Sequence, residues 1–145
     1  MDNFPAMQDL AGWLLAHEAA QVNPSEPTAQ AAACIRVCEK LRRPLSTLSG
    51  VAGYRALIGR ALALAKAEVP SLGPVRVKED GSLEAPGWDE TPRDMDETLN
   101  GGAALVAQLL GLLVTFLGEA LTMRLVRDVW PDAPYEVIDS ETEKP

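Results

Sequence analysis

Residues 103–118 have the sequence AALVAQLLGLLVTFLG, in which Gln108 is the one strongly polar side chain and no residue is charged. Leu and Ala dominate this run, and both residues favour the α-helix. A helix that is apolar on every side has to be surrounded by other parts of a protein. We therefore predict a helix over residues 102–129 whose apolar part, residues 103–118, is buried in the centre of the molecule.

The composition of the whole chain agrees with a helical bundle. The chain has 145 residues, of which 47% are apolar, 23% charged and 5% aromatic, as in a single globular domain. The 21 Ala and 20 Leu residues exclude an all-β domain. We predict an all-α fold, a bundle of about four long helices formed by residues 1–132. An acidic tail follows over residues 133–145, and we expect it to be mobile.

Proline, asparagine and glycine residues indicate where the other helices begin and end. We expect a first helix over residues 5–21 and a second that ends at the short segment Arg42-Arg43-Pro44. A third helix then covers residues 45–68, and the short connection makes the second and third helices antiparallel neighbours. Ahead of the last helix, residues 91–94 open a helical segment that Asn100-Gly101-Gly102 interrupts or bends.

A short β-hairpin is expected between the third helix and the last one. Residues 75–78 and 82–84 alternate between apolar and polar side chains on either side of an Asp80-Gly81 turn, a pattern typical of hairpins. Such a hairpin has to lie on the helices, with Trp88 as a plausible anchor. Residues 79–97 carry a net charge of −7, so the hairpin leads into an acidic loop.

The charge and the motif content argue against several classes of function. The net charge of −8 argues against general nucleic-acid binding, which needs an excess of Lys and Arg. The chain has no glycine-rich phosphate-binding loop, no nucleophile elbow and no zinc-protease motif. One histidine and two cysteines are too few for a disulfide framework or a self-sufficient zinc site. We predict that the chain is not an enzyme and uses no cofactor or metal.

The remaining reactive side chains have structural explanations. Cys34 and Cys38 are one helical turn apart on an apolar line, where cysteine acts as a small apolar residue rather than as a soft-metal ligand or redox pair. His17 ends an apolar stripe of the first helix, and we expect a hydrogen-bonded boundary residue there rather than a base. Three acids that lack a calcium-loop pattern are expected to stabilise the positive end of a helix: Asp94, Asp96 and Glu97.

Two stripes of small residues point to contacts between helices, because small side chains let another backbone approach closely. The stripe on the third helix consists of Ala52, Ala56, Gly59 and Ala63. The stripe on the long helix, with its polar edge, forms the predicted interaction site: Gln108, Gly111, Thr115, Gly118 and Glu119. We predict a non-catalytic interaction or regulatory subunit that acts through helix packing, as a homo-oligomer or as one component of a larger protein complex.

A second predicted interaction site is the basic cluster formed by Arg36, Lys40, Arg42 and Arg43. Aromatic residues do not interleave with it, which does not favour single-stranded nucleic acid. Three occupants stay open: a phosphate group, an acidic partner protein, and the chain's own acidic segment 79–97.

Two other classes of function also stay open. A membrane-associated or membrane-inserting protein would use residues 103–123, although the apolar run is shorter than the roughly 20 residues of a span. A small enzyme would build its site from Glu119, Gln108, His17 or the acidic loop. A binder of apolar ligands would instead use a pocket between helices that is lined by Leu and Ala. The amino-terminal residues lack the features of a secretory signal, and two free thiols suit a reducing compartment, so we expect a cytoplasmic protein.

Overall fold

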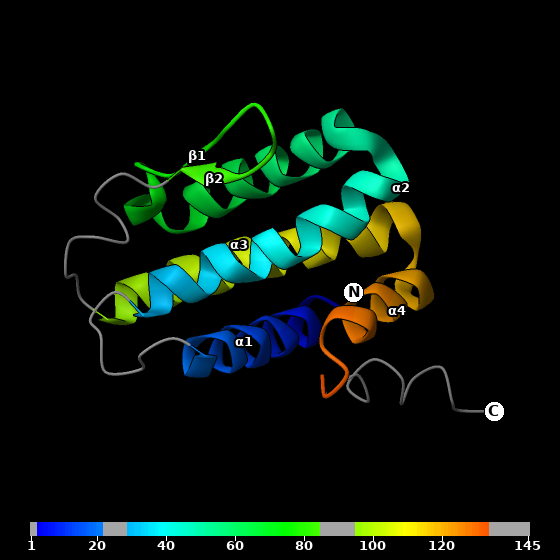
Figure 1. Ribbon diagram of the computed structural model, residues 1–145. Coiled ribbons are helices and arrows are strands. Elements are labelled where there is room, and N and C mark those ends of the chain that lie inside the picture. Colours follow the sequence, from blue (N-terminus) through cyan, green and yellow to red (C-terminus); the bar gives the residue numbers. More distant parts are fainter. Residues whose placement is uncertain (1–2, 22–28, 85–94, 134–145) are drawn as a thin grey trace.

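The computed structural model describes residues 3–21, 29–84 and 95–133 (Figure 1). Most of these residues are helical, and one short antiparallel hairpin is the only β-structure within them. The predicted all-α bundle with an inserted hairpin is therefore confirmed. The elements, in chain order, are α1 (Asn3–Gln21), α2 (Ala29–Glu68), a 3₁₀ turn (Pro70–Leu72), β1 (Arg76–Val77), β2 (Leu83–Glu84), α3 (Met95–Leu117) and α4 (Glu119–Val129).

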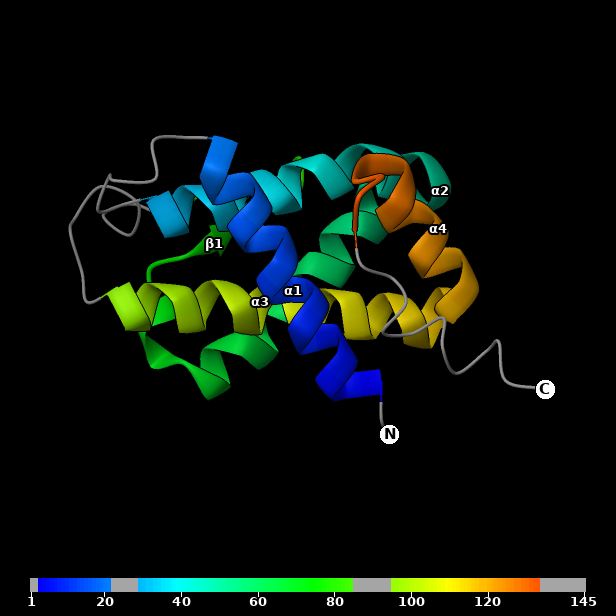
Figure 2. The ribbon, with the colours of Figure 1, turned by 90° about the horizontal axis from the view of Figure 1, so that it is seen from below.

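The core forms around α3, which packs against α1, α2 and α4 (Figures 1 and 2). Its buried face carries Leu105, Leu109 and Leu113, all without exposed surface. These side chains meet the apolar faces of α1 and α2 in one continuous cluster. The expectation that residues 103–118 are covered on every side is wrong for the last turns, because Phe116 is 65% exposed.

Helix α2 bends at Gly50 and not at the expected connection, Arg42-Arg43-Pro44. Pro44 removes one backbone donor, but the helix continues because Leu41 and Leu45, on either side of it, are both buried. At Gly50 the backbone has φ 80° and ψ 162°, a region that only glycine adopts readily. The helix therefore has two arms, 29–49 and 51–68, and the second arm runs back toward the end where the first began, as predicted (Figure 1).

A buried tyrosine holds the two arms of α2 together. The Tyr54 hydroxyl, on the second arm, donates a hydrogen bond of 3.2 Å to the carbonyl oxygen of Cys38 on the first. Tyr54 is 1% exposed, and burial raises the pKa of its hydroxyl well above the usual range. The phenol is therefore neutral at neutral pH and serves as a hydrogen-bond donor.

The predicted helix over 102–129 is two helices, since Gly118 separates α3 from α4 with φ 92° and ψ 158°. The expected interruption at Asn100-Gly101-Gly102 is absent, because α3 runs through these residues. Gly102 instead faces α2 closely: a Cβ atom built on it would lie 3.3 Å from Cβ of Cys34. This glycine lets two helices approach each other, and Gly118 turns the chain.

The hairpin agrees with its prediction. Strands β1 and β2 pair antiparallel, with Arg76 opposite Glu84 and Val77 opposite Leu83. Gly81 takes φ 91° in the turn, and a Cβ atom there would lie 2.8 Å from the Tyr54 ring, so the turn rests directly on the second arm of α2. The proposed anchor Trp88, the helix start at 91–94 and the tail from residue 134 lie outside the described residues.

The small-residue stripe of the second arm faces solvent and not another helix. Ala52, Ala56 and Ala63 are exposed, and no atom lies within 4 Å of a Cβ built on Gly59. Gly59→Ala is therefore expected to raise the free energy of unfolding by about 0.5–1 kcal/mol through helix propensity alone. Urea denaturation checks this value, with the closely packed Gly102→Ala as the comparison. A destabilised Gly59→Ala would mean that a second surface packs on this stripe.

Candidate interaction surfaces

One buried carboxylate organises the end of the bundle where α1, α2 and α4 meet. Glu18 belongs to the buried face of α1, next to Leu14, Leu15 and Ala19, and its side chain has no exposed surface. The apolar stripe of α1 therefore carries one acid at a position where an apolar residue is expected. A charge in such a place requires partners, because an unpaired buried carboxylate is very unfavourable.

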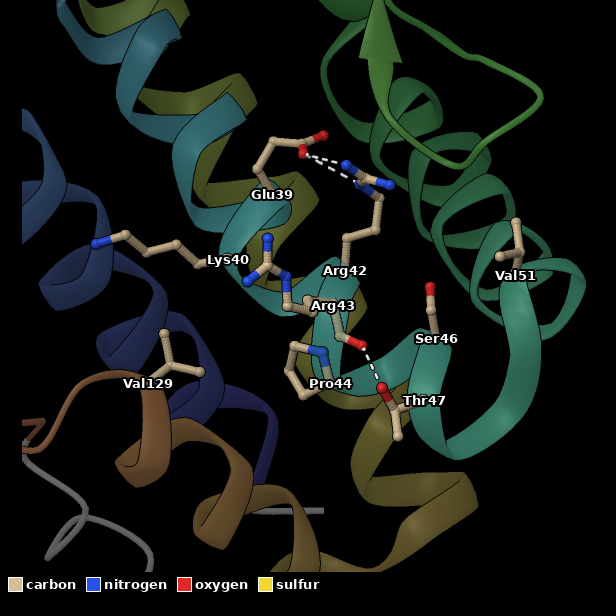
Figure 3. A pocket seen from close by; sticks show the side chains of 9 residues that line it. All are labelled: Glu39, Lys40, Arg42, Arg43, Pro44, Ser46, Thr47, Val51 and Val129. Atoms are coloured by element: carbon tan, nitrogen blue, oxygen red, sulfur yellow. Dashed lines mark hydrogen bonds and ion pairs between the residues drawn. The ribbon is translucent and has the colours of Figure 1, made fainter.

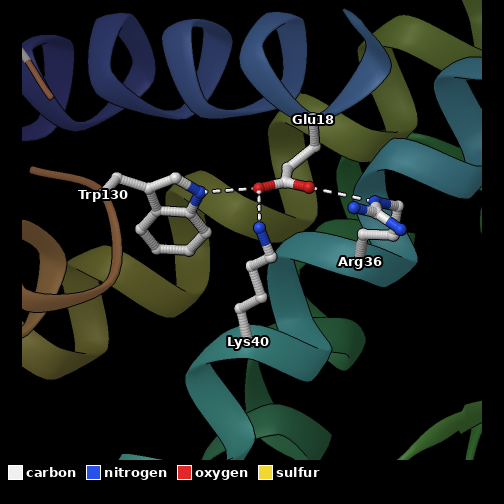
Figure 4. A network of polar contacts seen from close by, with 4 residues as sticks. All are labelled: Glu18, Arg36, Lys40 and Trp130. Atoms are coloured by element: carbon white, nitrogen blue, oxygen red, sulfur yellow. Dashed lines mark hydrogen bonds and ion pairs between the residues drawn. The ribbon is translucent and has the colours of Figure 1, made fainter. Parts of the chain in front are cut away.

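Three donors from two other elements surround this carboxylate (Figure 4). Arg36 Nε donates to Oε1 at 3.0 Å, and Lys40 Nζ donates to Oε2 at 2.6 Å, both from the first arm of α2. Trp130 Nε1, just after α4, donates to Oε2 at 2.8 Å. We call these four residues the Glu18 network, and it fixes α1, α2 and the end of α4 to one another.

The Glu18 network keeps the carboxylate ionised. Burial raises the pKa of Glu18, but the hydrogen bonds from Lys40, Trp130 and Arg36 lower it, and the net pKa lies below its ordinary value. The two cations are only partly covered, with side chains 42% and 40% exposed. Only the anion has lost its water, so the network must supply the hydrogen bonds that water would otherwise provide.

The lowered pKa of Glu18 predicts a loss of stability in acid. A carboxyl group whose pKa is lower in the folded state stabilises the fold above the unfolded-state pKa, and this contribution disappears as the pH falls through the folded-state value. The difference in unfolding free energy between the wild type and Glu18→Gln is therefore expected to be constant from about pH 7 to about pH 5 and to shrink below about pH 4.5. Urea midpoints across this range measure it. A difference that does not change with pH would contradict an ionised Glu18.

A groove lies beside this network, on the outer side of the first arm of α2 (Figure 3). Its volume is about 860 Å³, and Val51 of the second arm and Val129 of α4 close its two sides. Between these apolar sides, the floor is the last part of the first arm, residues 39–47. We call this feature the basic groove, because Lys40, Arg42 and Arg43 line it.

Three cations of the basic cluster pair with carboxylates of this chain, and the fourth is exposed in the groove. Arg36 and Lys40 bond Glu18, and Arg42 pairs with Glu39 at 2.9 Å. Glu39 also raises the pKa of the Arg42 guanidinium, first through its hydrogen bond and then through its charge. Arg43 is exposed, and no described carboxylate pairs with its guanidinium. Among the residues that line the groove, three cations face one carboxylate, Glu39, so the groove is positive on a chain of net charge −8.

The acidic segment supplies part of the counter-charge that the sequence suggested. Asp80 acts on Arg42 through its charge. The hairpin is also joined to the second arm of α2 by a hydrogen bond from Arg55 Nη1 to the backbone carbonyl oxygen of Glu79. Hydrogen bonds from the Ser82 hydroxyl and backbone lower the pKa of Asp80, so this acid is ionised. The hairpin thus stands at one edge of the cluster, but none of its residues lines the basic groove.

The second candidate surface is the outer side of α3. Gln108, Gly111, Leu112, Thr115 and Phe116 follow one another at helical spacing and are partly or fully exposed, and we call them the outer strip. Apart from the backbone of α3 itself, nothing lies within 4 Å of a Cβ built on Gly111. The Thr115 hydroxyl donates back to the carbonyl oxygen of Gly111 at 3.0 Å. Four of the five predicted interface positions fall on α3 or its end, but only Gln108, Gly111 and Thr115 belong to this strip.

The other members of that predicted interface occupy a different place. Gly118 forms the break after α3, and Glu119 is the first residue of α4, where it is partly buried. Gln108 Nε2 donates to Glu68 Oε2 at 3.0 Å, which ties the edge of the strip to the end of α2. The break therefore separates two predicted site residues from the strip.

The two cysteines and the histidine lie within the packed helices. Cys34 and Cys38 are buried and free, and a hydrogen bond with Cys34, together with burial, raises the pKa of Cys38 well above its ordinary value. The His17 ring is partly buried and stacks on the Trp13 ring, with centroids 4.9 Å apart. The side chains of Asp94, Asp96 and Glu97 lie outside the described residues.

The part of the chain that the structure describes lacks two other kinds of functional feature. It contains no cluster of three or more His, Cys, Asp or Glu side chains placed to hold a metal ion. None of its helices is long and apolar enough to cross a membrane.

No protein-family model matches the chain, and no curated protein and no solved structure matches it either. Its function must be argued from these surfaces.

Proposed function

We propose that this chain is a non-catalytic interaction subunit that packs the outer strip of α3 against a helix of a second protein chain, in the first place another copy of itself. The observation that carries the proposal is the exposure of Phe116, which is 65% exposed although it continues the most apolar helix of the protein. Large apolar side chains left exposed on a helix are typical of surfaces that bind another protein.

The surroundings of Phe116 suit a helical partner. One turn earlier, Gly111 leaves open space in which another helix can approach the α3 backbone. Leu112 is half-buried beside it, and Thr115 has already satisfied its hydroxyl on the helix itself, so neither resists removal from water. The outer strip therefore combines a large apolar anchor with a place for close approach.

Further exposed apolar residues extend this end of the molecule. Leu48 is 55% and Val51 is 50% exposed, and both lie at the bend of α2. The bend and the carboxyl end of α3 are at the same end of the bundle in both views (Figures 1 and 2). A partner seated on the outer strip would meet this end as well.

Light scattering on the purified chain tests the proposal. The 15.5 kDa chain is expected to form a dimer or larger species, and Gly111→Lys is expected to shift it toward the monomer by blocking close approach. Gly12→Lys on α1 is the matched control, since a Cβ there also meets nothing within 4 Å. A monomeric wild type at every concentration, or equal effects of the two lysines, would contradict self-association through the outer strip.

A further inference from the structure

We propose that the acidic carboxyl-terminal segment of this same chain, residues 134–145, binds in the basic groove beside Arg43. The basic groove shares no residue with the outer strip of α3, and Val51 alone of its lining residues also belongs to the exposed bend of α2 described above. It rests on charge, on apolar complementarity and on the position at which the described chain ends.

The charges of the segment and the groove are complementary. The segment contains Glu136, Asp139, Glu141 and Glu143 against one base, Lys144. In the groove, Glu39 pairs with Arg42, but no described carboxylate pairs with the Arg43 guanidinium, and the Glu18 network holds one cation more than its single anion. An acidic segment would therefore neutralise charge that the described residues leave unbalanced.

The apolar parts of the two surfaces also correspond. The groove carries its positive charge and Pro44 along the floor, and the apolar Val51 and Val129 lie at its two sides (Figure 3). Val51 is half exposed although it is a large aliphatic residue. The segment interleaves its acids with Tyr135, Val137 and Ile138, so it can bury apolar side chains while its carboxylates meet the arginines.

The described chain delivers the segment to the groove. Val129 lines the groove, and the next residue, Trp130, bonds the same Glu18 oxygen as Lys40 does. Ala133, the last described residue, is 4% exposed and so is held against the protein. Twelve further residues can extend up to about 40 Å, which is ample for a groove that begins at Val129. The short tether also gives the segment a high effective concentration there.

The acidic hairpin is a weaker occupant for the groove. Asp80 acts on Arg42 from the side of the second arm, and the hairpin turn is fixed on Tyr54. No hairpin residue lines the groove, so Arg43 is left to another anion.

Paramagnetic relaxation in the full-length chain tests the proposal. Ser140→Cys carries a nitroxide label, and Cys34 and Cys38 are buried, so the wild-type chain is expected to take up none. The amide signals of Arg43, Ser46 and Thr47 are expected to lose most of their intensity when the label is oxidised. The signal of Ala67, at the far end of the second arm of α2, is expected to keep its intensity.

Two variants decide whether the contact is the one proposed. Arg43→Glu is expected to restore the lost intensity, and Arg60→Glu, an exposed arginine outside the groove, is expected to leave the loss unchanged. No loss at the groove in the labelled wild type, or a loss that Arg43→Glu does not change, would overturn the proposal. A mixed sample contains nitroxide-labelled chain without isotopes and isotope-labelled chain without nitroxide. It distinguishes a segment that binds the groove of its own chain from one that binds the groove of a second copy. A loss in the mixture would show binding to a second copy and would overturn binding within one chain.

Discussion

Replacing Glu18 by alanine is expected to lower the free energy of unfolding by about 3 kcal/mol. The substitution leaves the buried Trp130 N–H without an acceptor and removes the anion that holds Arg36 and Lys40 together. The two cations are partly exposed and can recover water, which keeps the loss at the lower end of the range for a broken buried ion pair. In a chain of this size, the melting temperature should fall by roughly 10 °C.

Three further variants separate the parts of this effect. Asp9→Ala removes an exposed carboxylate from the same helix and is expected to change stability by less than about 0.5 kcal/mol. Glu18→Gln keeps an acceptor for Trp130 and is expected to cost about half as much as Glu18→Ala. The double variant Glu18→Gln/Lys40→Met should lose less stability than the two single variants together. In the double variant, Lys40→Met removes a cation that Glu18→Gln has already left without its anion. Additive costs would contradict the Glu18 network.

Gly118→Ala is expected to cost about 1–3 kcal/mol, the second largest effect. The φ of 92° with ψ of 158° lies in a region that a Cβ atom disfavours, whatever space surrounds it. The substitution is also expected to weaken the hydrogen bond between Trp130 and Glu18, because the direction in which α4 leaves Gly118 brings Trp130 to Glu18. Denaturant titration measures the loss of stability.

Gly12→Ala is the matched control for this substitution. Gly12 is exposed within α1, and a Cβ atom there meets nothing within 4 Å, so alanine should be neutral or stabilising. Gly50 has nearly the same backbone angles as Gly118, and Gly50→Ala should therefore behave like Gly118→Ala. Equal stability of Gly118→Ala and Gly12→Ala would show that the break does not depend on glycine.

The sequence predicts the helices and the hairpin well, but it misplaces the breaks between helices. Proline and paired glycines are the usual signals for an interruption, and here both lie inside continuous helices, at Pro44 and at Gly101-Gly102. Buried leucines hold the helix together around Pro44, and a close approach to Cys34 explains Gly102. The true breaks, at Gly50 and Gly118, are isolated glycines that the pattern does not distinguish from glycines such as Gly59.

The sequence predicts those parts of the candidate surfaces that lie within one helix, and misses the part that several elements form together. The basic cluster and the small residues of α3 are visible as local patterns, and the structure leaves part of each exposed. The Glu18 network was missed, because its members come from α1, α2 and the segment after α4. One signal was present: Glu18 follows Ala11, Leu14 and Leu15 at helical spacing, so it is an acid on an apolar face. An acid at such a position indicates that it pairs with a donor inside the protein, but the local sequence does not show which residue the donor is.

The hydrogen bond between Trp130 and Glu18 joins residues that are 112 positions apart. During synthesis from the amino terminus, α1 and α2 are complete long before Trp130 leaves the ribosome. Of the three donors to Glu18, Arg36 and Lys40 are therefore made well before Trp130. This contact therefore forms only after α1, α2, α3 and α4 have been made, which ties its contribution to stability to the arrival of α4.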